Sequence, residues 1–256
     1  MERFVYRFIA PTLRRSGWKS VCEIGASHGE TTDELLKLPL AAYTIVDPCF
    51  DEDLAEKYRA DRRVSVLRMN SLDALTSPEL LRPAAPFDCM LIDGDHNWYT
   101  VFNELRLIHE HGLLRPGGFI FLHDVSWPYA RRDMYYQPDA IPAEFRHPYA
   151  RRAIVEGQSQ LGKANGHNSH LANAVEEGGP RNGVLTAVED FLALHAKDYR
   201  FFPVKMEFGL GVLQLRAPGA RALWPFLSLR IEARTPEWVR KLGSLVKQGL
   251  KKLVAR

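Results

Sequence analysis

One stretch near the start of the chain decides the fold: Glu23-Ile24-Gly25-Ala26-Ser27-His28-Gly29-Glu30-Thr31-Thr32. An apolar run at residues 20–24 leads into it, and an amphipathic pattern typical of a helix follows at residues 30–38. Glycines at such a turn let the backbone approach a ligand, and the N-terminus of the following helix presents unpaired N–H groups. We interpret the stretch as a nucleotide-binding turn, with a plain tight turn as the alternative.

A second predicted strand, residues 43–46, ends at Asp47, where an acid is placed to bind ribose hydroxyls. A dinucleotide-binding turn would read Gly-x-Gly-x-x-Gly, in which the second glycine admits the pyrophosphate. Ser27 stands at that position, and an acid stands two residues before the first glycine. Such an acid suits a cationic ligand better than a diphosphate. Ser27 therefore argues against a nicotinamide-dependent oxidoreductase, which we keep as an alternative.

The turn resembles the first motif of the class I S-adenosylmethionine-dependent methyltransferases, in which the acid lies near the amino group of methionine. The resemblance implies S-adenosyl-L-methionine as the cofactor. It also implies a set of cofactor-binding positions: Glu23, Gly25, Ala26, Ser27, Gly29, Thr31, Asp47, Asn70, Ser71 and Asp93. Of these, Asn70 and Ser71 are polar residues that can hydrogen-bond adenine. We expect Gly25→Val to remove cofactor affinity and to leave the fold largely intact.

The rest of the chain alternates strands and helices, which predicts an α/β fold with a doubly wound, seven-stranded sheet. Further strands are predicted at residues 64–69, 87–92, 119–122, about 201–206 and 210–215, and further helices at 2–16, 52–60, 98–111 and 184–195. A late hairpin matches the methyltransferase sheet, whose final strand runs antiparallel. In such sheets ligands bind outside the carboxyl ends of the strands, so the residues at those ends are the candidates for a site.

Length and composition favour one cytoplasmic enzyme. A chain of 256 residues that is 46% hydrophobic can bury one large core with an inserted subdomain. No apolar run approaches the ~20 residues of a membrane span, and the N-terminal apolar run is too short for a signal peptide. Cys22, Cys49 and Cys89 are odd in number and widely spaced, so we predict buried, reduced thiols.

The C-terminal part is basic. Residues 216–256 carry ten Lys/Arg and two Asp/Glu, whereas the first 215 residues carry 24 Lys/Arg and 29 Asp/Glu. A hydroxyl, a proline and an acid at residues 235–237 predict a helix start, and apolar residues then recur at helical spacing among lysines. We predict a methyltransferase domain at residues 1–216 and a basic helical extension at 217–256. The helix packs on the body or on a second subunit of a homo-oligomer, or binds an anionic membrane surface; we favour packing.

Two predicted strands end in unusually polar residues. One ends in Asp93-Gly94-Asp95-His96, and the next ends in His123-Asp124. Side chains at neighbouring strand ends converge on one crevice, where carboxylates and imidazoles can hold a divalent cation. Helix capping is the alternative, and it accounts for one acid at each strand end but not for the histidines.

These segments, with Leu114-Arg115-Pro116-Gly117-Gly118, resemble a bacterial methyltransferase group that contains macrolide-sugar and rhamnosyl O-methyltransferases and cephalosporin-hydroxylase-like proteins. The resemblance covers residues 21–124 and 179–215. It implies that Asp93, His123 and Asp124 bind a metal, with Mg²⁺ the expected ion, and that Asp93 and His96 are catalytic, His96 as the general base. His123 stands where relatives usually carry an acid, which weakens the case for Mg²⁺.

Residues 125–181 show no long helical or alternating pattern, which predicts a lid or binding loop inserted after the fifth strand. Aromatic faces and guanidinium groups in it suit a sugar that bears a phosphate or carboxylate. We predict an acceptor site from one turn residue and several insertion residues: His28, Tyr129, Arg131, Arg132 and Tyr135. A polar run at residues 165–170 lies in the same segment. An insertion that only packs on the body or forms an oligomer contact is the alternative.

Together these patterns predict an S-adenosylmethionine-dependent O-methyltransferase that acts on a hydroxyl of a sugar-containing bacterial metabolite or glycan, as in natural product biosynthesis. Such a hydroxyl is weakly acidic, so its methylation needs a base and benefits from a cation. The alternatives are N- or carboxyl-methylation by the same fold, a nicotinamide-dependent oxidoreductase, and a cofactor-binding protein without catalysis. Nucleic acid is not an expected partner, because the first 215 residues are acidic overall.

Overall fold

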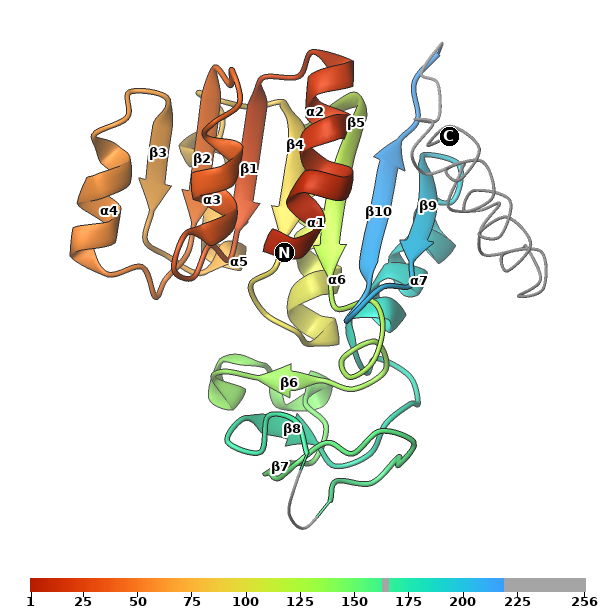
Figure 1. Ribbon diagram of the computed structural model, residues 1–256. Coiled ribbons are helices and arrows are strands. Elements are labelled where there is room, and N and C mark those ends of the chain that lie inside the picture. The colour runs from red at the N-terminus through yellow and green to blue at the C-terminus, as the bar shows by residue number, and fades with distance from the viewer. Residues whose placement is uncertain (163–165, 219–256) are drawn as a thin grey trace, which may run out of the picture. The chain divides into compact units, whose positions relative to one another are not determined.

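The computed structural model describes residues 1–162 and 166–218 (Figure 1). Their main feature is a seven-stranded sheet in the order β3-β2-β1-β4-β5-β10-β9. The first five strands in the chain are parallel, and β10 runs antiparallel to both of its neighbours, β5 and β9. The strands are β1 Ser20–Ile24, β2 Ala42–Val46, β3 Val64–Leu67, β4 Phe87–Ile92, β5 Leu114–His123, β9 Tyr199–Val204 and β10 Leu210–Leu215. The predicted doubly wound sheet with a late hairpin is confirmed.

Helices cover both faces of the sheet (Figure 1). The N-terminal helical segment and α3 lie on one face, and α6 and α7 pack side by side on the other. The helices are α1 Glu2–Phe4, a π-helical stretch Val5–Ile9, α2 Ala10–Ser16, α3 Glu30–Leu35, α4 Glu52–Arg59, α5 Ser71–Thr76, α6 Trp98–Glu110 and α7 Val184–His195. The short helix α5 was not predicted, because its six residues are too few to show a helical period.

The central strands explain the continuous apolar runs in the sequence. Every residue of β4 is buried, and so are Phe119–Leu122 of β5. Such runs, without alternation, are typical of parallel strands that helices cover on both faces. Strand β5 begins at Leu114, earlier than predicted, because Leu114 pairs with Phe87 before the register shifts and regular pairing resumes at Phe119.

The segment between β5 and α7 forms a small second sheet rather than an irregular lid. Its three antiparallel strands, in the order β6-β8-β7, are β6 Met134–Tyr135, β7 Tyr149–Arg151 and β8 Ala172–Ala174. Three short 3₁₀ turns accompany the two sheets, at Pro78–Leu80, Pro138–Ala140 and Ala143–Phe145. The small sheet lies beyond the carboxyl ends of β4 and β5 (Figure 1). We refer to residues 124–183 as the insertion.

The buried carboxylate of Asp133 fastens the insertion to the body. It accepts hydrogen bonds from the backbone N–H of Trp98 and of Gly183, both at 2.7 Å, and from the hydroxyl of Tyr135 at 2.9 Å. The first of these satisfies a free N–H at the start of α6, and the second lies directly before α7. One side chain of the insertion thus holds the starts of both helices.

Other sequence predictions concern single residues or the C-terminus. All three cysteines are free thiols, and Cys22 and Cys89 are buried as predicted, but Cys49 is exposed because it lies in the turn after β2. In residues 1–162 and 166–218, no helix combines the length and the apolar character needed to cross a membrane. The predicted basic helix lies outside the described residues, which end at residue 218.

Candidate active site

The glycine turn lies where β1 passes into α3, and its two glycines are required by contacts within the chain. Gly25 has a φ of +82°, and a Cβ added there would lie 2.4 Å from the backbone of Gly94 after β4. Gly29 has a φ of +83°, and an added Cβ would lie 2.0 Å from the hydroxyl oxygen of Tyr58. The expectation that Gly25→Val leaves the fold intact is therefore wrong, because backbone atoms occupy the space that a side chain would need.

Asp47, at the end of β2, shapes the turn. Its Oδ2 accepts hydrogen bonds from the backbone N–H groups of Ala26 at 2.9 Å and Ser27 at 2.8 Å, and its Oδ1 accepts one from Cys49 at 2.8 Å. Ser27 has a φ of +51°, in the left-handed region. The acid that the sequence assigned to ribose thus accepts hydrogen bonds from the backbone of the glycine turn and fixes its conformation.

Glu23 lies beneath the turn and does not line the cavity described below. Its carboxylate is buried and accepts hydrogen bonds from the hydroxyls of Thr32 and Tyr43, which belong to α3 and β2. Burial raises the pKa of Glu23 to about 7, although both hydroxyls oppose that shift. The structure therefore shows Glu23 joining β1, β2 and α3, whereas the sequence placed it near the amino group of methionine.

The remaining predicted cofactor positions lie around the same edge of the sheet. Thr31 is buried in the first turn of α3, and Asn70 and Ser71 lie at the start of α5, with Asn70 exposed. Asn70 Nδ2 donates to Asp73 Oδ2 at 3.3 Å. These residues follow the carboxyl ends of β1 and β3, which is where a doubly wound sheet binds its ligand.

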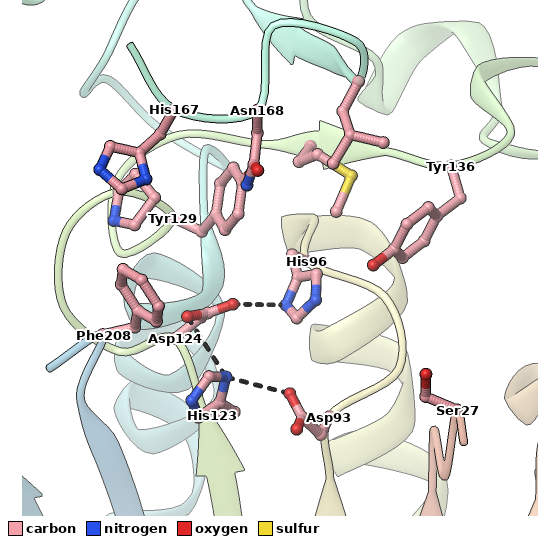
Figure 2. A pocket seen from close by; sticks show the side chains of 13 residues that line it. Ser27, Asp93, His96, His123, Asp124, Tyr129, Tyr136, His167, Asn168 and Phe208 are labelled. Carbon is pink, nitrogen blue, oxygen red and sulfur yellow. Dashed lines mark hydrogen bonds and ion pairs between the residues drawn. The ribbon is translucent and has the colours of Figure 1, made fainter. Parts of the chain in front are cut away.

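A cavity of about 340 Å³ opens between this edge of the sheet and the insertion (Figure 2). Ser27 and Asp93 border it on the side of the glycine turn. The other lining residues come from the ends of β4 and β5, from the insertion and from the turn before β10: His96, His123, Asp124, Pro128, Tyr129, Met134, Tyr136, His167, Asn168, Leu171 and Phe208. The insertion therefore roofs a cavity whose floor is the polar residues that the sequence singled out.

Two histidines and two carboxylates form ion pairs on the cavity floor (Figure 2). His96 Nδ1 lies 3.0 Å from Asp124 Oδ2. His123 Nδ1 lies 3.0 Å from Asp93 Oδ1 and 3.3 Å from Asp124 Oδ1. Asp93 Oδ2 also accepts a hydrogen bond from the amino group of Met1, at 2.6 Å.

The backbone of Asp124 is held in an unusual conformation. Its φ of +61° is in the left-handed region, which costs a residue with a side chain about 1–2 kcal/mol. The conformation turns its carboxylate toward both imidazoles, so Asp124 contacts His96 through one oxygen and His123 through the other. Capping a helix does not account for this geometry.

The ion pairs change the protonation of the cluster. Burial alone would lower the pKa of both histidines, but Asp124 and Asp93 outweigh it. The pKa of His96 is therefore raised above its ordinary value, and that of His123 is raised to about 9. Burial would raise the pKa of the carboxyls of Asp93 and Asp124, but the histidines bring both below the usual range. At neutral pH, His123 is thus a cation between two carboxylates.

The insertion fixes the position of His96. The ring of Tyr129 stacks on the imidazole with centroids 5.5 Å apart and 17° between the planes. The backbone N–H of Met134 donates to the carbonyl of His96 at 3.1 Å. With Nδ1 of His96 directed to Asp124, its Nε2 is the nitrogen left for another partner.

The predicted metal ligands are neighbours, but they do not converge on one point. Among residues 1–162 and 166–218, only His109, His195 and Asp198, far from this site in the sequence, bring three ligand atoms within 4.8 Å of one another. On the cavity floor, the His123 ring nitrogen occupies the space between the two carboxylates. Two carboxylates and one imidazole also suit a transition metal better than Mg²⁺, which prefers oxygen ligands. The residues as they lie do not fit a magnesium site.

Asp95 is not the helix cap that the sequence offered as an alternative, but it binds the side chain of the residue that is. Its Oδ2 accepts hydrogen bonds from Asn97 Nδ2 at 2.6 Å and from the hydroxyl of Thr100 at 2.8 Å. Asn97 is the N-cap of α6, because its Oδ1 accepts from the backbone N–H of Thr100 at 2.9 Å. Of the polar residues after β4, Asp93 and His96 therefore face the cavity, and Asp95 and Asn97 start the helix.

Most of the residues predicted to bind the acceptor lie elsewhere. Arg132 is fully buried and donates to the backbone carbonyls of the insertion, and Arg131 pairs with Glu189 on α7. Tyr135 donates to Asp133, and His28 is exposed and does not line the cavity. Tyr129 is the one of the five that lines it. The reason is that the direction of a side chain in an irregular segment does not follow from its spacing.

Several lining residues were not assigned by the sequence. His167 and Asn168 belong to the polar run at residues 165–170, for which the sequence pattern predicts no specific contact. Asn168 Nδ2 donates to the hydroxyl of Tyr129 at 2.6 Å. Phe208 reaches the cavity from the turn between β9 and β10, and nothing in its sequence context distinguishes it from other apolar residues.

Residues 22–125 match a family model described as a methyltransferase domain. The matched segment runs from β1 to just past β5, so it contains the glycine turn and the four ion-paired residues of the cavity floor. Residues 22–125 are therefore similar to a methyltransferase domain, and the predicted enzyme class, a methyltransferase, is confirmed at that level. A comparison with curated proteins gave no match.

Three solved structures match most of this chain at low sequence identity. MycE methyltransferase from the mycinamycin biosynthetic pathway, solved with Mg, SAH and mycinamycin VI, is 16% identical at a TM-score of 0.49, over 86% of this chain and 52% of that one. A protein of Klebsiella pneumoniae assigned as an O-methyltransferase is 18% identical at a TM-score of 0.48. The match covers 82% of this chain and 79% of that one. The 1,6-didemethyltoxoflavin-N1-methyltransferase of Burkholderia thailandensis is 15% identical at a TM-score of 0.47. The match covers 81% of this chain and 76% of that one.

Proposed function

We propose that this protein is an S-adenosylmethionine-dependent O-methyltransferase whose acceptor is a hydroxyl of a sugar-containing metabolite or glycan. The observation that carries the proposal is the His96–Asp124 pair on the floor of a cavity that the glycine turn borders. A methyltransferase domain with a buried, oriented imidazole in its cavity is equipped to take a proton from a weakly acidic acceptor.

The cofactor is proposed from the turn and the sheet edge. The resemblance of the turn to the first motif of class I methyltransferases, together with the matched methyltransferase domain, supports S-adenosylmethionine. Asp47 holds the turn open by binding two of its N–H groups, and Ser27 and Asp93 border the cavity beside it.

When bound, the cofactor would supply an electrophilic methyl group: the acceptor oxygen would form a bond to the methyl carbon as the S–CH₃ bond breaks, and S-adenosylhomocysteine would leave. The chain contributes position and proton removal. His96 receives the acceptor proton at Nε2, because Asp124 accepts a hydrogen bond from Nδ1–H and so selects the tautomer with a free Nε2. The negative charge of Asp124 then stabilises the imidazolium that forms.

His123 supplies a positive charge beside the acceptor. As an imidazolium between Asp93 and Asp124, it stabilises the oxygen that loses its proton, which is the effect that a metal ion provides in other enzymes. For a divalent ion to bind here, His123 would have to leave its place between the carboxylates. The proposed reaction therefore includes no step at a metal.

The residues that line the cavity suit a sugar, and the positions of Arg131 and Arg132 indicate that this sugar carries no negative charge. The aromatic rings of Tyr129, Tyr136 and Phe208 can pack on the apolar face of a sugar ring, and His167 and Asn168 can hydrogen-bond its hydroxyls. Arg131 and Arg132 do not line the cavity, and among residues 1–162 and 166–218 no other arginine offers it a guanidinium for a phosphate or carboxylate. We therefore propose a neutral sugar unit at this position.

Two alternatives are weaker. A carboxylate acceptor would need no base and would face the carboxylates of Asp93 and Asp124, and a protonated amine would have to lose its proton first. A nicotinamide-dependent oxidoreductase would need a second glycine where Ser27 stands, and the matched family is a methyltransferase domain.

Calorimetry and mass spectrometry test the proposal. The purified protein should bind S-adenosylmethionine and should not bind NADH. With a panel of sugar-bearing metabolites, it should release S-adenosylhomocysteine and add one methyl group to a hydroxyl of at least one of them. Binding of NADH without S-adenosylmethionine would contradict the cofactor, and methylation only at an amine or carboxylate would contradict the acceptor.

A further inference from the structure

A second cluster of histidines lies away from the cavity, at the other end of α6. His109 lies in the last turn of α6, His195 is the last residue of α7, and Asp198 lies just before β9. One ligand atom from each residue lies within 4.8 Å of the other two. Within residues 1–162 and 166–218, no other trio of His, Cys, Asp or Glu meets this condition.

The cluster is compact without being closed by hydrogen bonds between its members. The rings of His109 and His195 have centroids 4.1 Å apart and planes tilted by 51°. His195 Nδ1 lies 3.7 Å from Asp198 Oδ2, which is longer than a hydrogen bond. Two imidazoles at this separation repel each other if both are protonated, whereas two neutral imidazoles can share a cation.

Neighbouring side chains hold both rings in place. Phe191 packs against the His195 ring at 4.7 Å between centroids and against the His109 ring at 6.2 Å. The hydroxyl of Tyr199 lies 3.4 Å from His109 Nδ1. A metal-ligating imidazole commonly hydrogen-bonds through its second nitrogen, and the Tyr199 hydroxyl gives His109 such a partner.

The ends of two helices also favour a positive charge here. Helices α6 and α7 pack side by side and end close together, since His109 and His195 lie in their last turns. Each helix C-terminus carries about half a negative charge from its free carbonyl groups. Asp198 adds a carboxylate that is half exposed, so a cation can enter from solvent.

We propose that His109, His195 and Asp198 bind a zinc ion that joins the ends of α6 and α7 to the start of β9. Two imidazole nitrogens and one carboxylate oxygen are a zinc ligand set, with the fourth position left for water. The same donors suit Mg²⁺ or Ca²⁺ poorly, because those ions take oxygen ligands. The site stands apart from the catalytic cavity, and its role is to stabilise this edge of the fold.

Zinc titration of tag-free, chelator-treated protein tests the site. His195→Ala should lower zinc affinity by about 100-fold, and Asp198→Asn should lower it by about tenfold; loss of an orienting partner alone costs about 10–100-fold. Zinc should raise the unfolding temperature of the wild type and not that of His195→Ala, and MgCl₂ should not raise it. Asp198→Asn changes an exposed side chain, so it tests the site even if His195→Ala folds poorly.

Two control variants separate this site from other histidines. His111→Ala, which removes a histidine at the end of α6 outside the trio, should bind zinc like the wild type. His123→Ala, which removes an imidazole from the cavity floor, should keep the zinc-dependent rise in unfolding temperature. The proposal is overturned if His195→Ala and Asp198→Asn bind zinc like the wild type, or if His123→Ala is the variant that loses it.

Discussion

Asp124 Oδ2 lies 3.0 Å from His96 Nδ1, at the point where the carboxyl ends of β4 and β5 meet below the insertion. The pair combines an oriented imidazole with a carboxylate whose pKa lies below its usual range. Because Tyr129 stacks on the same imidazole, the insertion and the sheet together set the direction of its free nitrogen.

The first prediction concerns the pH dependence of turnover. Only neutral imidazole accepts a proton, so kcat should rise as the pH increases through the raised pKa of His96 and then level off. Asp124→Asn removes the main cause of the raised pKa. The rising limb should therefore move to lower pH while the plateau falls, and a pH–rate profile of both proteins measures this. If the rising limb of the Asp124→Asn profile stays in place or moves to higher pH, Asp124 does not raise the pKa of His96.

The second prediction concerns stability. The pKa of His123 is about 9 in the folded protein and about 6.5 in an unfolded chain. The imidazolium therefore contributes its full stabilisation below pH 6.5, and that contribution is lost as the pH rises through about 9. The difference in unfolding free energy between the wild type and His123→Asn should shrink from pH 6 to pH 9.5 in urea titrations. A difference that is independent of pH would show that His123 is not held as a cation.

The third prediction concerns metal removal. Since the His123 ring lies between Asp93 and Asp124, we expect EDTA to leave turnover unchanged. The assay needs the true acceptor and dialysed enzyme. Loss of activity on EDTA treatment, with recovery on adding Mn²⁺ or Mg²⁺, would show that these residues rearrange around an ion, as the resemblance implied.

The fourth prediction concerns the glycine turn. Gly25→Ala forces a Cβ to within 2.4 Å of the Gly94 backbone, whereas Gly17→Ala, also at positive φ, meets nothing within 4 Å. Both variants carry the ~1–2 kcal/mol cost of the left-handed conformation. Gly25→Ala should lose a further ~1–3 kcal/mol from overpacking, which chemical denaturation can measure. Equal losses in the two variants would show that the chain relaxes around the new methyl group.

Much of the fold and the cavity floor followed from the sequence. Apolar runs such as residues 87–92 identify buried strands, and parallel strands bring their carboxyl ends to one edge. The convergence of Asp93, His96, His123 and Asp124 is a consequence of that geometry. Local pattern and topology were sufficient here, because each residue stands at a strand end.

The direction of individual side chains was harder to predict. Arg132 lies among tyrosines and other arginines in the insertion, as an acceptor-binding arginine would. It is nevertheless fully buried and donates hydrogen bonds to backbone carbonyls of the insertion. Glu23 follows the motif spacing, but Thr32 and Tyr43 bind its carboxylate inside the protein. Both outcomes depend on partners distant in sequence, which neither periodicity nor motif spacing encodes.

The most direct test of the proposed base is the turnover of His96→Ala with an acceptor that the wild type methylates. Release of S-adenosylhomocysteine should fall ~10²–10⁴-fold, the usual contribution of a general base, while calorimetric affinity for S-adenosylmethionine stays that of the wild type. His111→Ala, a histidine outside the cavity, should match the wild type in both measurements. Wild-type turnover by His96→Ala would contradict the assignment of His96 as the base.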